Sequence, residues 1–132
     1  MSFFRYPGGK AKLYSAISKC LAAYDNIDHY IEPFFGGGSV GLRFIAENPH
    51  LKRIWFNDIN PALICLWISV LKYPEELKKL IREFRPTTKK FYIYKEWLEA
   101  LNVVPNNPHN QIMFGFLQLA IHQISYSGLC YS

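Results

Sequence analysis

The sequence predicts an α/β protein that opens with a Rossmann-like βαβ unit and continues with helices only. Two observations predict this. An apolar run at 27–31 breaks into three consecutive glycines, and apolar residues then return at helical spacing. A second apolar stretch, 51–57, has the length and aromatic content of a strand. A strand, a glycine turn, a helix and a second strand in this order predict a parallel pair joined by a right-handed crossover.

The composition is that of one folded domain. Of the 132 residues, 50% are hydrophobic and 17% are aromatic, which argues against a disordered chain. The longest apolar run, 62–71, has about half the length of a membrane span. The three cysteines are widely spaced and predict free thiols in a reducing cytoplasm, while the four histidines predict no metal site and are expected in surface or loop positions.

Spacing predicts the elements of the first half. Apolar residues recur every three or four positions from Lys10 to Tyr24, which predicts an amphipathic helix. The helix after the glycines should start near Val40 and stop before Pro49, because the residue preceding proline is pushed out of the helical region. The strand at 51–57 is expected to be buried on both faces.

Helix start signals organise the second half. Asn60 followed by proline predicts a capped helix to about Leu71, and Pro74 predicts the start of another. Further helices are expected at 89–101 and 110–124. The last of these is apolar nearly all round, so it should be covered on several sides.

The glycine turn carries a ligand-binding pattern. Gly36, Gly38 and Gly41 match the spacing of the dinucleotide fingerprint, and Asp58 follows 20 residues beyond Gly38, at the end of the second strand. A carboxylate there can accept hydrogen bonds from ribose hydroxyls. The same pattern suits NAD or S-adenosylmethionine, because both lay an adenosine across the ends of the two strands.

Residues that flank the glycine turn favour S-adenosylmethionine over NAD. The segments Tyr-Pro-Gly-Gly-Lys (6–10), Ile-Glu-Pro-Phe-Phe-Gly-Gly-Gly-Ser-Val (31–40) and Phe-Asn-Asp-Ile-Asn-Pro (56–61) resemble three successive motifs of the Dam-type, adenine-specific (N6) DNA methyltransferases. A weaker likeness at 125–130 falls in that family's target-recognition region. Ser127 and Tyr131 depart from that region's pattern, so base-specific contacts are not transferred.

The resemblance implies a binding site for S-adenosylmethionine. Its cofactor-binding residues would be Tyr6, Lys10, Glu32, Phe35, Gly36, Gly38 and Asp58. The first two would close over the cofactor, the last would bind its ribose, and the others would form the floor beneath its methionine part. The Lys10 ammonium could pair with the cofactor's carboxylate, and the Glu32 charge would suit its sulfonium or amine.

The resemblance also implies double-stranded DNA as partner and a role in DNA methylation by a cytoplasmic prokaryotic or phage-like protein. Residues 1–70 would supply the cofactor-binding part, and 71–132 the helical start of the target-recognition region. The family's catalytic loop, of Asp-Pro-Pro-Tyr type, is absent from this sequence. Asn107-Pro108-His109 is the nearest stretch and has one proline too few.

No catalytic residue is therefore predicted, and the chain alone is expected to be inactive. A truncated chain, one half of a split enzyme, or a binding module without catalysis would each explain this, and the first two are favoured. An unpaired strand edge and an apolar patch would then recruit a second chain or another copy.

A basic segment leaves a second function open. Eight lysines and arginines against three acids lie between Lys72 and Lys95, interleaved with aromatic rings. They suit a nucleic-acid-binding module without catalysis. A solvated helix face explains the charges equally well, and the rings are more typical of a core.

Overall fold

The computed structural model describes residue 4 and residues 10–125. The chain forms two compact units, 1–58 and 59–132, and each is described by itself. The assignment of residues 1–70 and 71–132 to cofactor and target recognition stays a prediction.

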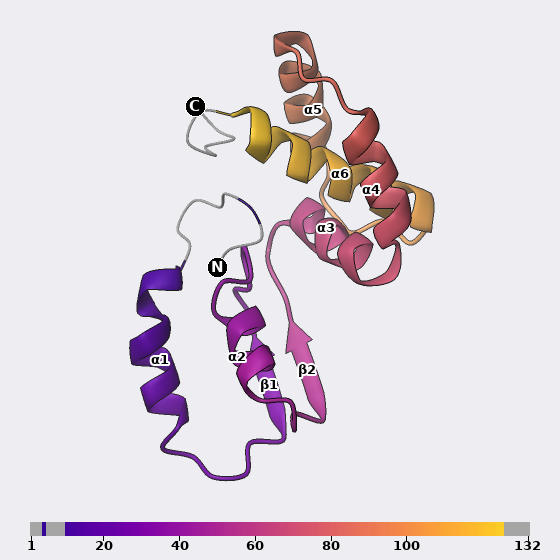
Figure 1. Cartoon of the computed structure of the whole chain (residues 1–132). Helices are drawn as coiled ribbons and strands as arrows, with labels where there is room; N and C mark the ends of the chain where they lie inside the picture. The colour runs from indigo at the N-terminus through magenta and orange to yellow at the C-terminus, as the bar shows by residue number, and fades with distance from the viewer. Residues whose placement is uncertain (1–3, 5–9, 126–132) are drawn as a thin grey trace. The chain divides into compact units, whose positions relative to one another are not determined.

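The first unit is a parallel βαβ arrangement preceded by a helix (Figure 1). Its elements are a 3₁₀ helix η1 (Lys10–Leu13), α1 (Tyr14–Leu21), β1 (His29–Glu32), α2 (Gly41–Glu47) and β2 (Arg53–Phe56). The strands pair in parallel, from His29 opposite Arg53 to Glu32 opposite Phe56. This confirms the mixed α/β class and the parallel pair, while two strands are too few to establish a Rossmann-like sheet.

The core of this unit lies between α1, β1 and α2. Tyr14, Tyr30, Val40 and Phe44 form a buried cluster. The rings of Tyr30 and Phe44 stack with centroids 4.9 Å apart. Tyr30 comes from the strand and Phe44 from the helix, so α2 is held against one face of the sheet by aromatic packing.

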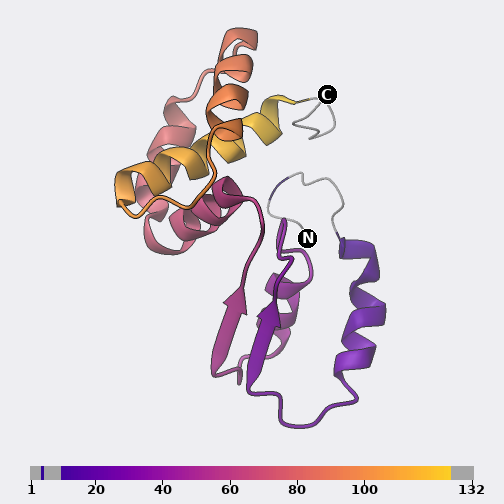
Figure 2. The ribbon, with the colours of Figure 1, turned by 180° about the vertical axis from the view of Figure 1, so that it is seen from behind.

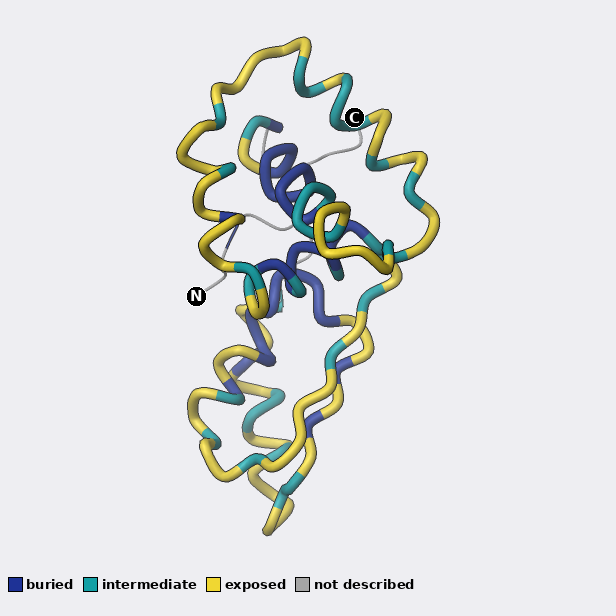
Figure 3. Tube along the Cα trace, turned by 90° about the vertical axis from the view of Figure 1, so that its right-hand side faces the viewer, coloured by how far each residue is buried: buried dark blue, intermediate teal, exposed yellow. Residues whose placement is uncertain are grey.

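The other face of the sheet carries no helix of this unit among the described residues (Figure 2). Ile31 and Trp55 are register partners on that face, and they are 63% and 53% exposed. The expectation that the second strand is buried on both faces is therefore wrong, because α2 covers only one side of the pair. The sequence of β2 is mostly apolar, but most of its residues are exposed to solvent, as the yellow stretch in Figure 3 shows.

The first helix and the first strand also differ from their expected bounds. The first helix divides into η1 and α1 and ends at Leu21, before the expected Tyr24. Asn26 then takes a left-handed conformation with φ of 61°, which asparagine tolerates better than most residues. This turn delays β1 to His29.

The second unit consists of four helices, α3 (Pro61–Lys72), α4 (Pro74–Glu83), α5 (Thr88–Glu99) and α6 (Pro108–Ile124). The predicted cap is confirmed, since the Asn60 side chain accepts hydrogen bonds from the N–H groups of Ala62 and Leu63 at 3.0 and 3.1 Å. Asn107 caps α6 in the same way, accepting from the Asn110 N–H at 2.8 Å. The expected helix starts at residue 110 and does not include that second cap.

Helix α6 is the centre of this unit and contacts α3, α4 and α5. Residues 115–122 are all buried, as the dark blue helix in Figure 3 shows, which confirms that α6 is covered on several sides. His122 is one of them, so its expected surface position is wrong. Its Nε2 lies 2.8 Å from the Gln118 Nε2, and this hydrogen bond allows an imidazole to sit inside an apolar helix.

Candidate cofactor-binding site

The glycine loop starts where β1 ends and is tied to the end of β2. The Asn57 N–H donates to the Glu32 carbonyl at 3.0 Å, and the Phe35 N–H donates to the Asn57 carbonyl at 2.9 Å. Gly36 and Gly38 have φ values of 54° and 69°, a conformation that glycine adopts without steric cost. The loop therefore needs glycine at both positions for its own backbone.

Glu32 places a buried carboxylate at the carboxyl end of β1. Its side chain is 11% exposed, and Oε1 lies 3.3 Å from the Lys10 Nζ. Its Oε2 accepts a hydrogen bond of 2.8 Å from the Tyr30 hydroxyl. The Lys10 ammonium also donates to the Phe34 carbonyl. The pairing and the hydrogen bond offset the cost of burying the Glu32 charge.

Gly41, the third glycine of the fingerprint, has a packing role. A Cβ at this position would lie 2.5 Å from the Phe35 Cε2 and 2.6 Å from the Glu32 Oε2. Both distances are shorter than any ordinary carbon contact. The absence of a side chain at Gly41 thus gives the Glu32 carboxylate and the Phe35 ring their places against α2.

Phe35 forms the apolar base of the loop. It is 1% exposed, and its ring stacks on that of Phe56 with centroids 4.1 Å apart. Phe34 points the other way and is 74% exposed. The loop therefore rests on Phe35, while the backbone carbonyl of Phe34 accepts a hydrogen bond from the Lys10 ammonium.

Asp58 connects the end of β2 to the glycine loop. Its Oδ2 accepts a hydrogen bond of 2.9 Å from the Gly36 N–H, and the residue is half-buried. The carboxylate that follows β2 thus lies directly against the glycine loop. The same bond also gives Asp58 a structural task, which the fingerprint does not predict.

Of the seven predicted site residues, six lie in the described part and are gathered at the carboxyl ends of the two strands. Tyr6 lies outside the described residues, as do Ser127 and Tyr131. Tyr30, which binds Glu32, is not among the residues predicted from the sequence. Alternation along β1 could have found it, because residues two apart in a strand point to the same face.

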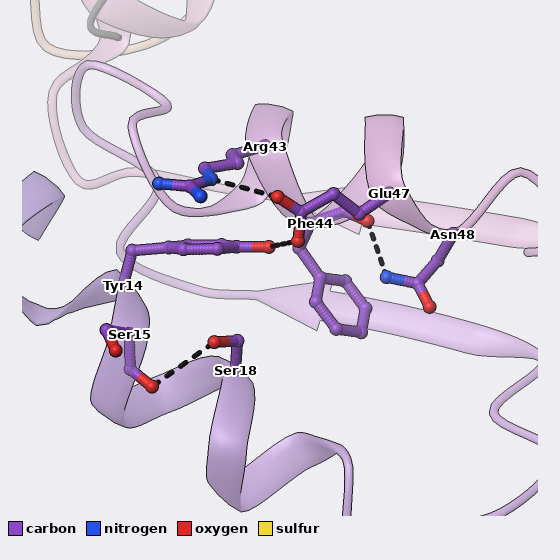
Figure 4. Close-up of polar contacts among 7 residues, drawn as sticks. All are labelled: Tyr14, Ser15, Ser18, Arg43, Phe44, Glu47 and Asn48. Atoms are coloured by element: carbon purple, nitrogen blue, oxygen red, sulfur yellow. Dashed lines mark hydrogen bonds and ion pairs between the residues drawn. The ribbon is translucent and has the colours of Figure 1, made fainter.

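A separate cleft of about 490 Å³ opens at the other end of the strands, between α1 and the loops that precede them. Its wall includes Tyr14, whose hydroxyl donates to Glu47, and Arg43 lies over the Tyr14 ring at 4.2 Å and binds the same carboxylate at 2.9 Å (Figure 4). Burial, and then the bond to Glu47, raise the pKa of Tyr14 to about 12. These contacts hold α1 against α2, and none of them involves the glycine loop.

The basic segment of the second unit exposes its charges. Six of its eight basic residues are exposed, all except Lys90 and Lys95. The aromatic rings divide: Phe84 packs edge-on against Phe116 of α6 at 5.4 Å, whereas Tyr92 and Trp97 are 64% and 50% exposed. Part of this aromatic set is therefore core, and part lies on the surface.

Neither a membrane-spanning helix nor a metal-binding cluster is found among the described residues. No helix there has both the length and the apolar content to cross a membrane. No cluster of three or more histidine, cysteine or acidic side chains there could hold a metal ion.

The chain also resembles known proteins in sequence. Residues 6–132 match the family model described as D12 class N6 adenine-specific DNA methyltransferase. The chain is 36% identical over 89 residues to Type II methyltransferase M.MjaIII of Methanocaldococcus jannaschii, a match covering 62% of this chain and 30% of that protein. It is 27% identical over 92 residues to Type II methyltransferase M1.LlaDCHI of Lactococcus lactis subsp. cremoris, covering 69% and 30%.

The chain thus matches about a third of the length of these two curated relatives. The family match itself spans both compact units and includes Lys10, the glycine loop and Asp58. The chain belongs to the D12 class N6 adenine-specific DNA methyltransferases.

Proposed function

We propose that the first unit binds S-adenosylmethionine for methyl transfer to adenine N6 in DNA. The observation that carries this proposal is the pair formed by the Lys10 ammonium and the buried Glu32 carboxylate, 3.3 Å apart beside the glycine loop. The methionine end of the cofactor is a zwitterion. One cation and one anion of the protein, held side by side, are the charges needed to bind its carboxylate and its amine.

The remaining predicted residues fit the other parts of the cofactor. The backbone of Gly36 and Gly38 offers close approach without side chains, and Phe35 supplies the floor. Asp58 would accept hydrogen bonds from the ribose hydroxyls, and Tyr6 would close over the cofactor with Lys10. When bound, the cofactor supplies the electrophilic methyl group.

NAD is the second candidate, because the fingerprint and Asp58 alone suit either adenosine cofactor. The Lys10–Glu32 pair favours S-adenosylmethionine, since the nicotinamide half of NAD offers no amino-acid zwitterion. The family membership points the same way.

A calorimetric titration of matched variants tests the proposal. Asp58→Ala should weaken S-adenosylmethionine binding by about tenfold or more, the usual cost of losing a hydrogen bond to a charged group. Asp25→Ala removes an exposed carboxylate of the same unit and should leave binding unchanged. Equal binding by wild type and Asp58→Ala would remove Asp58 from the site.

We propose that the second unit contributes to DNA binding through its basic segment. Exposed lysines and arginines neutralise phosphates, so affinity should fall with salt at a logarithmic slope of about −0.9 for each phosphate contacted. Replacing Lys78 and Lys79 by glutamine should reduce that slope by up to about 2. DNA binding that is indifferent to salt would exclude this surface.

Methyl transfer itself should need an Asp-Pro-Pro-Tyr-type loop, which these residues do not supply. In the family that loop binds the adenine amine and stacks on the flipped base. We expect no transfer by these 132 residues alone and restoration when a polypeptide carrying the loop is added. Methyl transfer by this chain without a complement would overturn that expectation.

The same complement, or a second copy, would cover the open face of the β1–β2 pair. Ile31 and Trp55 present adjacent apolar side chains there, and each strand has one hydrogen-bonded neighbour among the described residues. Light scattering should show association at high concentration. Trp55→Lys should reduce it, and a concentration-independent monomer in the wild type would contradict the proposal.

A further inference from the structure

Tyr30 is a buried residue at the proposed site that neither the sequence motifs nor the family match assigns. It is 9% exposed and belongs to the core cluster of the first unit. Its ring stacks on Phe44 of α2 at 4.9 Å. Among the described contacts, its hydroxyl makes one hydrogen bond, which it donates to the Glu32 Oε2 at 2.8 Å.

The two oxygens of Glu32 have separate partners. Oε2 faces the interior, between the Tyr30 hydroxyl and the space that the missing side chain of Gly41 leaves. Oε1 faces Lys10, which lies beside the loop. A carboxylate with one oxygen bound by a rigid donor is fixed in rotation, so the direction of the second oxygen is fixed as well.

The donor is rigid and stays protonated. The Phe44 stack holds the Tyr30 ring, and strand pairing opposite Ile54 holds its backbone. Burial, followed by the bond to Glu32, raises the pKa of Tyr30 above its usual range. At any physiological pH the phenol therefore donates and does not repel the carboxylate.

We propose that Tyr30 is a positioning residue for cofactor binding: through Glu32 it aims one carboxylate oxygen at the amine of the methionine part and keeps Lys10 beside it for the carboxylate. The inference rests on the proposed function of this site. It gives the Tyr30 phenol a task that its packing alone does not require, because phenylalanine would fill the same volume.

Tyr30→Phe tests this directly, since it keeps the stacked ring and removes only the donor. Calorimetric affinity for S-adenosylmethionine should fall about tenfold. Affinity for 5′-methylthioadenosine, which lacks both the amine and the carboxylate, should stay within about twofold of wild type. Tyr14→Phe is the matched control, because it also removes a buried phenol that donates to a glutamate, in the same cluster.

A double-mutant cycle separates positioning from a structural effect. Glu32→Gln alone should weaken S-adenosylmethionine binding, and adding Tyr30→Phe to it should cause little further loss, because the two residues act through one carboxylate. Thermal unfolding of each variant establishes that it is folded at the titration temperature. Additive losses, or equal losses for both ligands, would overturn the inference.

The same titrations distinguish the role of Tyr30 from the proposed function of the site. A wild type that binds no S-adenosylmethionine would overturn the proposed function and the inference with it. A wild type that binds, with Tyr30→Phe and Tyr14→Phe binding equally well, would overturn the role of Tyr30 alone.

Discussion

Replacing Gly41 by alanine should damage both stability and the proposed site. The new Cβ would lie 2.5 Å from the Phe35 Cε2 and 2.6 Å from the Glu32 Oε2. Phe35 is 1% exposed and stacked on Phe56, and Glu32 is held by Tyr30 and Lys10. Neither neighbour can swing into solvent, so α2 or the carboxylate must shift.

The magnitude follows from two opposing effects. Overpacking a well-filled site costs about 1–3 kcal/mol, and replacing glycine by alanine in a helix recovers at most about 1 kcal/mol. A net loss of about 1–2 kcal/mol in the free energy of unfolding is expected, measured by urea denaturation followed by circular dichroism. Because Glu32 is displaced, affinity for S-adenosylmethionine should fall about tenfold as well.

Gly115→Ala is the matched control for that experiment. Its Cβ would be crowded equally, at 2.7 Å from both the Cys65 carbonyl oxygen and the Ser69 Oγ, but in the other unit. It should destabilise the protein and leave cofactor affinity unchanged. A Gly41→Ala variant as stable as the wild type, with unchanged affinity, would refute the packing role given to Gly41.

Three further outcomes are expected. Asn60→Ala should lower the free energy of unfolding by about 1 kcal/mol, because α3 loses its cap; thermal denaturation measures this, and no loss would contradict the assigned cap. The double variant Ser69→Ala/Gly115→Ala should lose less free energy of unfolding than the two single variants lose together, by about 0.5 kcal/mol or more, because the Ser69 Oγ is one of the atoms that crowd the new Cβ. Strictly additive losses would argue against that contact. Tyr14 has its pKa raised to about 12, so the folded state binds this proton more tightly than the unfolded state. Its contribution to stability is complete below pH 10 and is lost as the pH rises toward 12; denaturation curves over this range should be flatter in Tyr14→Phe, and identical pH profiles would contradict the assignment.

Local signals in the sequence were sufficient for most elements. The Asn60-Pro61 pair marks the start of α3, and the structure has that cap. Asn107 and Pro108 start α6 in the same way, two residues before its expected beginning. The parallel pair and its glycine loop follow from one apolar run, three glycines and a second apolar run. These signals succeed because capping and positive φ are decided within a few residues.

Burial could not be predicted in the same way. The apolar residues of β2 suggest a strand covered on both faces, whereas Trp55 is 53% exposed because α2 covers one side only. His122 shows the opposite difference. Its polar side chain is expected at the surface, but it is buried because Gln118, one turn earlier, provides a hydrogen bond. The burial of each residue depends on neighbours that cannot be identified from the local sequence.

The site shows the same division. The motifs place Lys10, Glu32, the glycines and Asp58 in one region, and the structure brings them together at the strand ends. The direct bond from Gly36 to Asp58 and the contact from Tyr30 to Glu32 depend on side-chain rotamers. Alternation along β1 puts Tyr30 on the correct face, but only the structure shows which oxygen it binds.

The central claim is that the glycine loop, with Lys10, Glu32 and Asp58 around it, holds S-adenosylmethionine. Parallel calorimetric titrations of the chain with S-adenosylmethionine and with NAD test it most directly. Saturable binding of S-adenosylmethionine, at least about tenfold tighter than any binding of NAD, is the predicted result, a difference of about one hydrogen bond to a charged group. Binding of NAD alone would contradict the claim.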